Sequence, residues 1–352
     1  MRKFNLAALL LASVLVGCGG GGAGDQSSKV RFSSQVSFGD SLSDVGSYKV
    51  GTVAALGGAE FTINGAGRNW TELMAAQFGL PAPCAAQTGL DGAAAQGFSV
   101  MPPVNHAGCT GYAQGGARVT NPVGVGNKLT GGANATLGML TVPVVTQIQN
   151  HLAAVGGSFR GDEAVFMLAG ANDVFMQLGS VGAGLITPAS AVAAVGTAAS
   201  ELVAQVNTQV VGKGAKYVVV INVPDITITP YAATLTQPSR DLIGTMVTTF
   251  NSQLHAGLAN NPNVLYVDAY SASRDEVYNP AIYGLTNTSA TACDLTNPAT
   301  NPLGSSLVCN STNLIPGVVD HYMFADGVHP TPYGYLLLAR LVSKEMLVKG
   351  WL

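Results

Sequence analysis

The sequence predicts an α/β protein, a three-layer α/β/α domain with a mainly parallel sheet. Short apolar segments of strand length alternate along the chain with longer segments whose apolar residues recur at helical spacing. Strands that are apolar on both faces are typical of parallel sheets, because helices bury both sides of such a sheet. We find no internal repeat and no second shift in composition, which indicates one domain over residues 30–352.

The elements follow in order along the chain. The first strand is expected at 35–40, and the first helix at 68–80, where apolar residues including Trp70 fall on one helical face. Residues 81–138 are rich in Gly, Ala, Asn and Pro without a sustained period, so we interpret them as loops. Further strands are expected at 163–170, 216–224 and 263–270, and further helices at 141–155, about 188–212, about 239–260 and from 331 onward.

The first 29 residues predict export. Residues 1–17 join a basic start to a short apolar segment, as in a secretory signal peptide. Residues 15–18 resemble the lipobox of bacterial lipoproteins, in which Cys18 becomes the lipidated N-terminus, and residues 18–29 then form the lipidated cysteine and a flexible Gly-rich tether. We therefore expect lipid anchoring to the bacterial cell envelope. Gly19 favours the outer membrane by the same resemblance; secretion from an ordinary signal peptide is the alternative.

Cysteine usage agrees with an oxidising compartment. Of five cysteines, assigning Cys18 to the lipid leaves four, which allow three disulfide pairings. We favour Cys84 with Cys109 and Cys293 with Cys309, since each pair is close in sequence and lies in a loop-like stretch. The chain has no CxxC pair and no clustered histidines, so no metal site is expected.

Composition disfavours one class of partner. Charged residues make up 10% of the chain and the net charge is −3, whereas an average protein is about 25% charged. No cluster of Lys and Arg is present, so nucleic-acid binding is not expected. The oligomeric state is not indicated.

Three segments carry reactive side chains. Ser41 follows the first predicted strand, Asn172 follows the strand at 163–170, and Asp326 and His329 precede the last helix. The carboxyl ends of parallel strands meet at one edge of a sheet, where α/β proteins place their sites. A carboxylate three residues before a histidine can hold its Nδ1 proton, which leaves Nε2 free to accept a proton from a serine. Each segment alone is common in turns; their combination points to nucleophilic catalysis.

In this order the segments resemble the SGNH or GDSL hydrolase superfamily, over nearly all of the chain from Val36 to about Leu347. The likeness is greatest to the extracellular phospholipase, lecithinase and haemolysin-like branch, partly through residues 39–48 and 279–293. It implies a flavodoxin-like α/β/α architecture and an enzyme that hydrolyses carboxylic esters without a metal or an organic cofactor.

The resemblance also assigns roles. Ser41 would be the nucleophile, His329 the general base and acid, and Asp326 the carboxylate that orients it. The oxyanion hole would consist of the Ser41 N–H, the Gly116 N–H and the Asn172 amide, with Gly115 as the other register for the glycine. The sequence departs from its relatives at Gly111, where they usually carry Asn.

The remaining polar candidates are expected to support structure. Asp40, Asp44 and Asp173 would brace their loops through backbone hydrogen bonds. Four further histidines are expected at the surface or in packing: His106, His151, His255 and His321. For His321 alone, contact with the substrate is the alternative.

The substrate class is the least determined property. Gly- and Ala-rich loops around 85–140 suit an apolar acyl groove, which favours an esterase, lipase or phospholipase acting on a small-molecule or lipid ester. An acetyl esterase acting on glycans is the alternative, which 7% aromatic content disfavours. A surface lipoprotein that only binds is the other alternative. It predicts a broken set of signature residues, yet Ser41, Gly116, Asn172 and His329 are all present.

Overall fold

The computed structural model describes residues 30–132 and 135–352. The signal peptide expected at 1–17, the lipidated Cys18 and the tether expected at 18–29 lie outside the described residues. Trp351, which follows the last helix, packs in the hydrophobic core.

Four parallel strands form the central sheet, in the order β1-β4-β5-β6. Their bounds are β1 Ser34–Gly39, β4 Glu163–Leu168, β5 Tyr217–Ile221 and β6 Val264–Val267. All six residues of β4 are buried, as expected for a strand covered on both faces. Because side chains alternate along a strand, Val165 and Met167 enter one core while Ala164, Phe166 and Leu168 enter the other.

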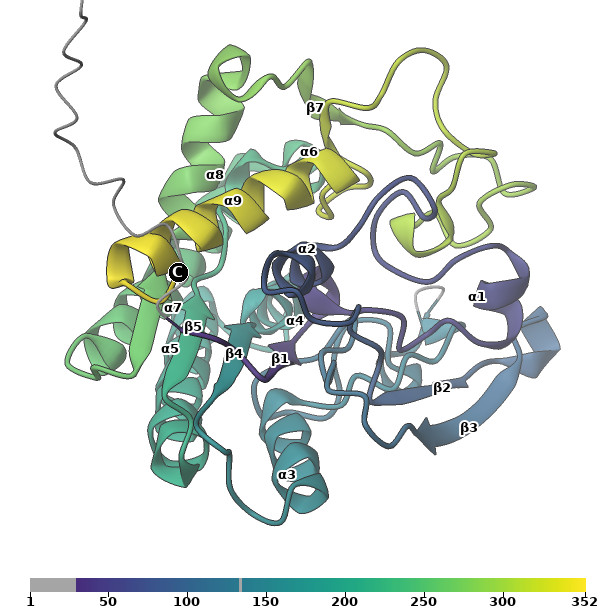
Figure 1. Ribbon diagram of the computed structural model, residues 1–352. Coiled ribbons are helices and arrows are strands. Elements are labelled where there is room, and N and C mark those ends of the chain that lie inside the picture. Colours follow the sequence, from purple (N-terminus) through teal and green to yellow (C-terminus); the bar gives the residue numbers. More distant parts are fainter. Residues whose placement is uncertain (1–29, 133–134) are drawn as a thin grey trace, which may run out of the picture.

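Helices cover both faces of this sheet (Figure 1). One face packs against α3 (Val144–Ala154), α5 (Pro188–Gln205) and α7 (Gln237–Leu258), and the other packs against α2 (Trp70–Gln77) and α9 (Pro332–Lys349). The predicted three-layer α/β/α fold with a mainly parallel sheet is therefore confirmed. The remaining helices are α1 (Gly51–Ala55), α4 (Ala171–Gly182), α6 (Pro230–Ala233) and α8 (Ala269–Tyr278).

Two predictions about local structure were wrong or incomplete. Residues 81–138 are not all loop, because β2 (Gln87–Asp91) and β3 (Val100–Asn105) form an antiparallel pair there. The sequence also did not predict α4, α8 or a small parallel sheet of β7 (Asn287–Thr291) and β8 (Tyr322–Phe324). These elements surround the carboxyl edge of the central sheet, so their absence from the prediction matters for the site.

Two disulfides close loops beside that edge. Cys84 is joined to Cys109 around the β2–β3 pair, and Cys293 is joined to Cys309. These are the pairs that the sequence favoured.

Within 30–132 and 135–352, one helical stretch, Pro188–Lys213, is long and apolar enough to cross a membrane. Its residues Ala191, Val195 and Leu202 are buried in the core between α5 and the sheet, which identifies it as a core helix.

Candidate active site

Ser41 leaves the sheet at a sharply defined point. Gly39, the last residue of β1, has φ +144°, and a Cβ there would lie 2.0 Å from the carbonyl oxygen of Leu168 in β4. Only glycine therefore allows the end of β1 to pass so close to the backbone of β4. Gln147 holds this exit through two hydrogen bonds of 2.8 Å, one from the Gly39 N–H and one to its carbonyl oxygen. Ser41 begins the short helix η1 (Ser41–Ser43), at the carboxyl edge of the sheet.

His329 lies between Ser41 and Asp326. Its Nε2 is 2.8 Å from Ser41 Oγ, and its Nδ1 is 2.8 Å from Asp326 Oδ2. The backbone N–H groups of Ser306, Val328 and His329 also donate to this carboxylate. Burial alone raises the pKa of Asp326, but His329 and these hydrogen bonds outweigh it and hold that pKa well below its usual range. Asp326 is therefore ionised, and it orients the imidazole toward the serine.

Donors for a developing oxyanion lie beside Ser41. Asn172, in the first turn of α4, lines the same cavity and donates one amide hydrogen to the Ala117 carbonyl at 2.9 Å. The Gly115 N–H is already bound to Asp44 at 2.8 Å. The N–H groups of Ser41 and Gly116, by contrast, donate to no other residue in the described part of the chain. This geometry favours Gly116 over Gly115 as the glycine of the oxyanion hole.

Two buried aspartates hold the Gly116 loop from opposite ends. Asp44 accepts the N–H groups of Gly46, Ser47 and Gly115. Asp173 accepts from Arg118 Nε at 2.9 Å and from the Val119 N–H at 3.0 Å. Both aspartates therefore brace the loop, as the sequence led us to expect.

Asp40 caps η1 by accepting the Leu42 N–H at 3.1 Å. Its second oxygen, Oδ2, is enclosed without a hydrogen bond to any described residue. Burial raises the pKa of Asp40 to about 7, and the nearby His329 opposes this rise. Asp40 therefore braces η1, and its burial disfavours the charged form of its carboxyl group.

The departure at Gly111 has a steric explanation. Gly111 pairs with both Ser37 and Ala85, and a Cβ there would lie 2.7 Å from Val45 Cγ2 and 2.9 Å from the Cys84 carbonyl oxygen. An asparagine would not fit this position without a shift of its neighbours. The Cys84–Cys109 disulfide lies next to it and anchors the loop instead.

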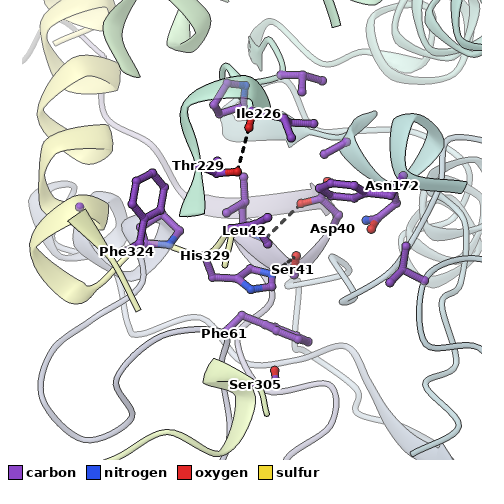
Figure 2. A pocket seen from close by; sticks show the side chains of 18 of the residues that line it. Asp40, Ser41, Leu42, Phe61, Asn172, Ile226, Thr229, Ser305, Phe324 and His329 are labelled. Carbon is purple, nitrogen blue, oxygen red and sulfur yellow. Dashed lines mark hydrogen bonds between the residues drawn. The ribbon is translucent and has the colours of Figure 1, made fainter. Parts of the chain in front are cut away.

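A cavity of about 360 Å³ opens over Ser41 and His329. Figure 2 shows Ile226 and Thr229 on one side of this pair and Phe61 and Ser305 on the other. We divide the lining of the cavity by the chain segments that supply it. The sheet-edge channel is defined by residues that follow the central strands or lie on α9, namely Leu42, Phe175, Ile226, Ala269, Ala272 and Leu338; the loop-side cleft is defined by residues of the outer loops, namely Phe61, Val125, Met139, Leu303 and Leu307.

The groove expected from residues 85–140 is therefore only part of the cavity. Those loops supply one wall of the loop-side cleft, whereas the sheet-edge channel comes from segments that follow β1, β4, β5 and β6 and from α9. These lining residues could not be predicted from the sequence, because α8 was not predicted and its position beside α9 is a long-range property.

The other histidines lie outside the cavity wall. His321 stacks on Tyr333 with ring centroids 4.1 Å apart, and its Nδ1 is 2.7 Å from the Gly284 carbonyl oxygen. His151 is buried among Phe38, Tyr112 and Phe159. His106 lies 2.8 Å from Thr88 Oγ1, and His255 packs on Tyr266. Each of the four therefore serves packing or the surface.

Fold and geometry together define a class of protein. A serine, a histidine and an ionised aspartate are hydrogen bonded in series at the carboxyl edge of a parallel sheet, which is the arrangement of serine hydrolases. The chain belongs to the GDSL-like lipase/acylhydrolase family, whose model matches residues 36–342. The predicted membership of the SGNH or GDSL superfamily is thus confirmed.

The chain is also similar to a GDSL esterase/lipase of Arabidopsis thaliana. The two are 29% identical over 150 residues, which cover 39% of this chain and 36% of the relative. The match therefore spans about a third of the length of that curated relative.

Proposed function

We propose that the protein is an exported serine esterase or lipase that hydrolyses carboxylic esters through an acyl-enzyme on Ser41. The observation that carries this proposal is the hydrogen-bonded series Ser41, His329, Asp326 beside two uncommitted backbone N–H groups. Family membership supports ester hydrolysis as the reaction class.

The geometry accounts for each step. Ser41 Oγ attacks the ester carbonyl carbon while His329 Nε2 accepts the hydroxyl proton, and the ionised Asp326 stabilises the imidazolium. The N–H groups of Ser41 and Gly116 and the Asn172 amide hold the tetrahedral oxyanion. The bond to the alcohol oxygen then breaks and His329 gives that oxygen its proton. Water repeats the sequence on the acyl-serine, with His329 as base, and releases the carboxylic acid.

The two parts of the cavity suit the two parts of an ester. The loop-side cleft adjoins His329, since Phe61 packs against its ring at 4.8 Å, and His329 must reach the leaving alcohol. The sheet-edge channel instead begins at Leu42 and Asn172, on the oxyanion side. We therefore assign the acyl chain to the channel and the alcohol to the cleft.

Export and anchoring are part of the proposal. Two disulfides are typical of a protein that folds in an oxidising compartment. The signal peptide and lipobox predicted at residues 1–18 support lipidation of Cys18 and anchoring to the cell envelope, the outer membrane being favoured. Growth of an expressing bacterium with labelled palmitate should label the wild type and not Cys18→Ser; equal labelling would refute the anchor.

The activity is tested by hydrolysis of p-nitrophenyl esters from acetate to palmitate, with Ser41→Ala in parallel. We expect turnover by the wild type and a loss of roughly 10⁴- to 10⁶-fold in the variant. An optimum at acetate would favour the acetyl esterase, and a longer optimum the acyl esterase or lipase. Absence of turnover in a folded, disulfide-bonded protein would contradict catalysis and favour a binding lipoprotein.

A further inference from the structure

The carboxyl group of Glu276 lines the cavity without a hydrogen-bond partner among the described residues. Helix α8 presents Ala269, Ala272, Ser273 and Glu276 to the cavity. This spacing places all four on one helical face over two turns, a length of about 10 Å. Glu276 is therefore the member furthest from the sheet along this wall.

The Glu276 side chain is largely buried and faces the cavity. The residue is 7% exposed, and its carboxyl oxygens make no hydrogen bond or ion pair with a described residue. Arg274, two residues earlier, instead pairs with Asp225 at 2.6 Å. Burial raises the pKa of Glu276 to about 7, and Asp275 adds to the rise. Buried acids are normally paired, so a carboxyl left facing a cavity indicates a missing ligand group.

Glu276 lies where the far end of an acyl chain bound in the channel would reach. The channel runs across the carboxyl edge of the sheet, from Leu42 after β1 to Ala269 after β6. Three strand spacings of about 4.8 Å separate these points, so the crossing is roughly 14 Å long. Its walls are mainly aliphatic, with Ile226, Ala272 and Leu338 among them. Glu276 is thus a polar group at the far end of a mainly apolar channel.

We propose that Glu276 is a specificity-determining residue that selects acyl chains bearing a hydroxyl group at or near their far end. The inference rests on the proposed function, because it takes the channel as the acyl site. A plain alkyl end would displace water from this carboxyl without replacing the hydrogen bond. A hydroxyl can donate to the ionised carboxylate and accept from the protonated acid, so it matches both forms.

A cationic chain end is the other chemistry that a carboxyl attracts. Such a group would have to leave water and pass along the aliphatic walls, which costs far more than transfer of a hydroxyl. The structure therefore favours the hydroxylated chain, and the cationic chain becomes an outcome of the test.

The test compares matched p-nitrophenyl esters, plain, ω-hydroxy and ω-amino, from octanoate to hexadecanoate. At the best chain length, the wild type should favour the ω-hydroxy ester over the plain ester in kcat/KM by about tenfold or more. Glu276→Leu should abolish or reverse this preference, whereas Glu276→Gln should keep part of it. Glu345→Leu, which removes an acid of α9 that does not line the cavity, should leave it unchanged.

Two measurements separate failure of this proposal from failure of the proposed function. Hydrolysis of p-nitrophenyl acetate by the wild type, and its loss in Ser41→Ala, reports on the reaction alone, because this ester is too short to reach Glu276. Calorimetric binding of 10-hydroxydecanoate and decanoate to the Ser41→Ala protein reports on the channel without catalysis, because the carboxylate end of both belongs at the oxyanion hole, and the hydroxy acid should bind about tenfold more tightly. Equal binding of the two, or preference for the ω-amino ester, would overturn recognition of a hydroxyl.

Discussion

His329 Nε2 lies 2.8 Å from Ser41 Oγ, although 288 positions separate the two residues in the chain. The first strand of the sheet and the segment before the last helix thus meet at one edge. This hydrogen bond forms only if both segments are correctly packed. Measurements of catalysis therefore also test the packing of these two segments.

Asp326→Asn should disable the histidine while preserving its surroundings. The amide cannot stabilise an imidazolium, and it favours the wrong tautomer of His329, so we expect kcat for p-nitrophenyl acetate to fall by about 10⁴. The rate of p-nitrophenol release by the purified protein measures kcat, and circular dichroism tests whether the variant is folded. Asp320→Asn, an exposed aspartate nearby, is the matched control and should be unaffected. A loss below tenfold in Asp326→Asn would refute the role of the carboxylate.

Asn172→Ala should remove one donor from the oxyanion hole. Because this donor is needed mainly in the transition state, kcat should fall by about 10²- to 10³-fold with little change in KM. The exposed Asn260→Ala serves as the control. A variant that raised KM alone would show that Asn172 binds the ground state of the substrate instead.

Asp40→Asn should change how stability depends on pH. Burial raises the pKa of Asp40 from 3.8 to about 7, so the folded protein keeps a proton that the unfolded chain releases between those values. Stability from this group therefore falls as pH rises through that window. Relative to the wild type, Asp40→Asn should gain at most about 1.4 kcal/mol of unfolding free energy per pH unit within this window.

Urea unfolding of both proteins at several pH values between 4 and 7 measures this difference. The buried His151, whose lowered pKa acts in the opposite direction, is common to both proteins and cancels. Asp320→Asn should show a flat difference. A flat difference for Asp40→Asn as well would mean that its carboxyl ionises freely in the folded state.

Removal of either disulfide should destabilise the fold. The closed loops separate the paired cysteines by 25 and 16 positions, which corresponds to about 3 kcal/mol each in the chain-entropy model. Denaturant unfolding of Cys84→Ser/Cys109→Ser and of Cys293→Ser/Cys309→Ser measures these losses. Unchanged midpoints would show that the loops are held by their other contacts.

The sequence predicted the four sheet strands because each is a short apolar segment with a clear end. Strand β3 lacked such a signal, since five of its six residues are exposed and Pro102 and Pro103 lie within it. Helix α4 was missed because it begins in the segment that carries Asn172, and Gly170 at its start has no side chain to cap it.

The site was predicted in part for a related reason. Ser41, Asn172 and His329 stand in short recognisable segments, so their order alone suggested their roles. The cavity wall depends on how α8 and α9 pack, and neither Glu276 nor Leu338 belongs to a local motif. Likewise, the hydrogen bond from Gly115 to Asp44 and the unbound N–H of Gly116, which distinguish the two glycine registers, are visible only in the structure.

The far wall of the sheet-edge channel comes from α8, a helix that carries neither the serine, the histidine nor the oxyanion donors. If the acyl chain binds in this channel as proposed, the α8 residues at its far wall lie in a different part of the sequence from the residues that cleave the bond. Substituting the small residues Ala269 or Ala272 with larger ones would shorten the channel and leave the hydrogen bonds of Ser41 and His329 in place. On the proposed acyl assignment, substitutions on this one face of α8 would change the preferred chain length without touching the catalytic residues.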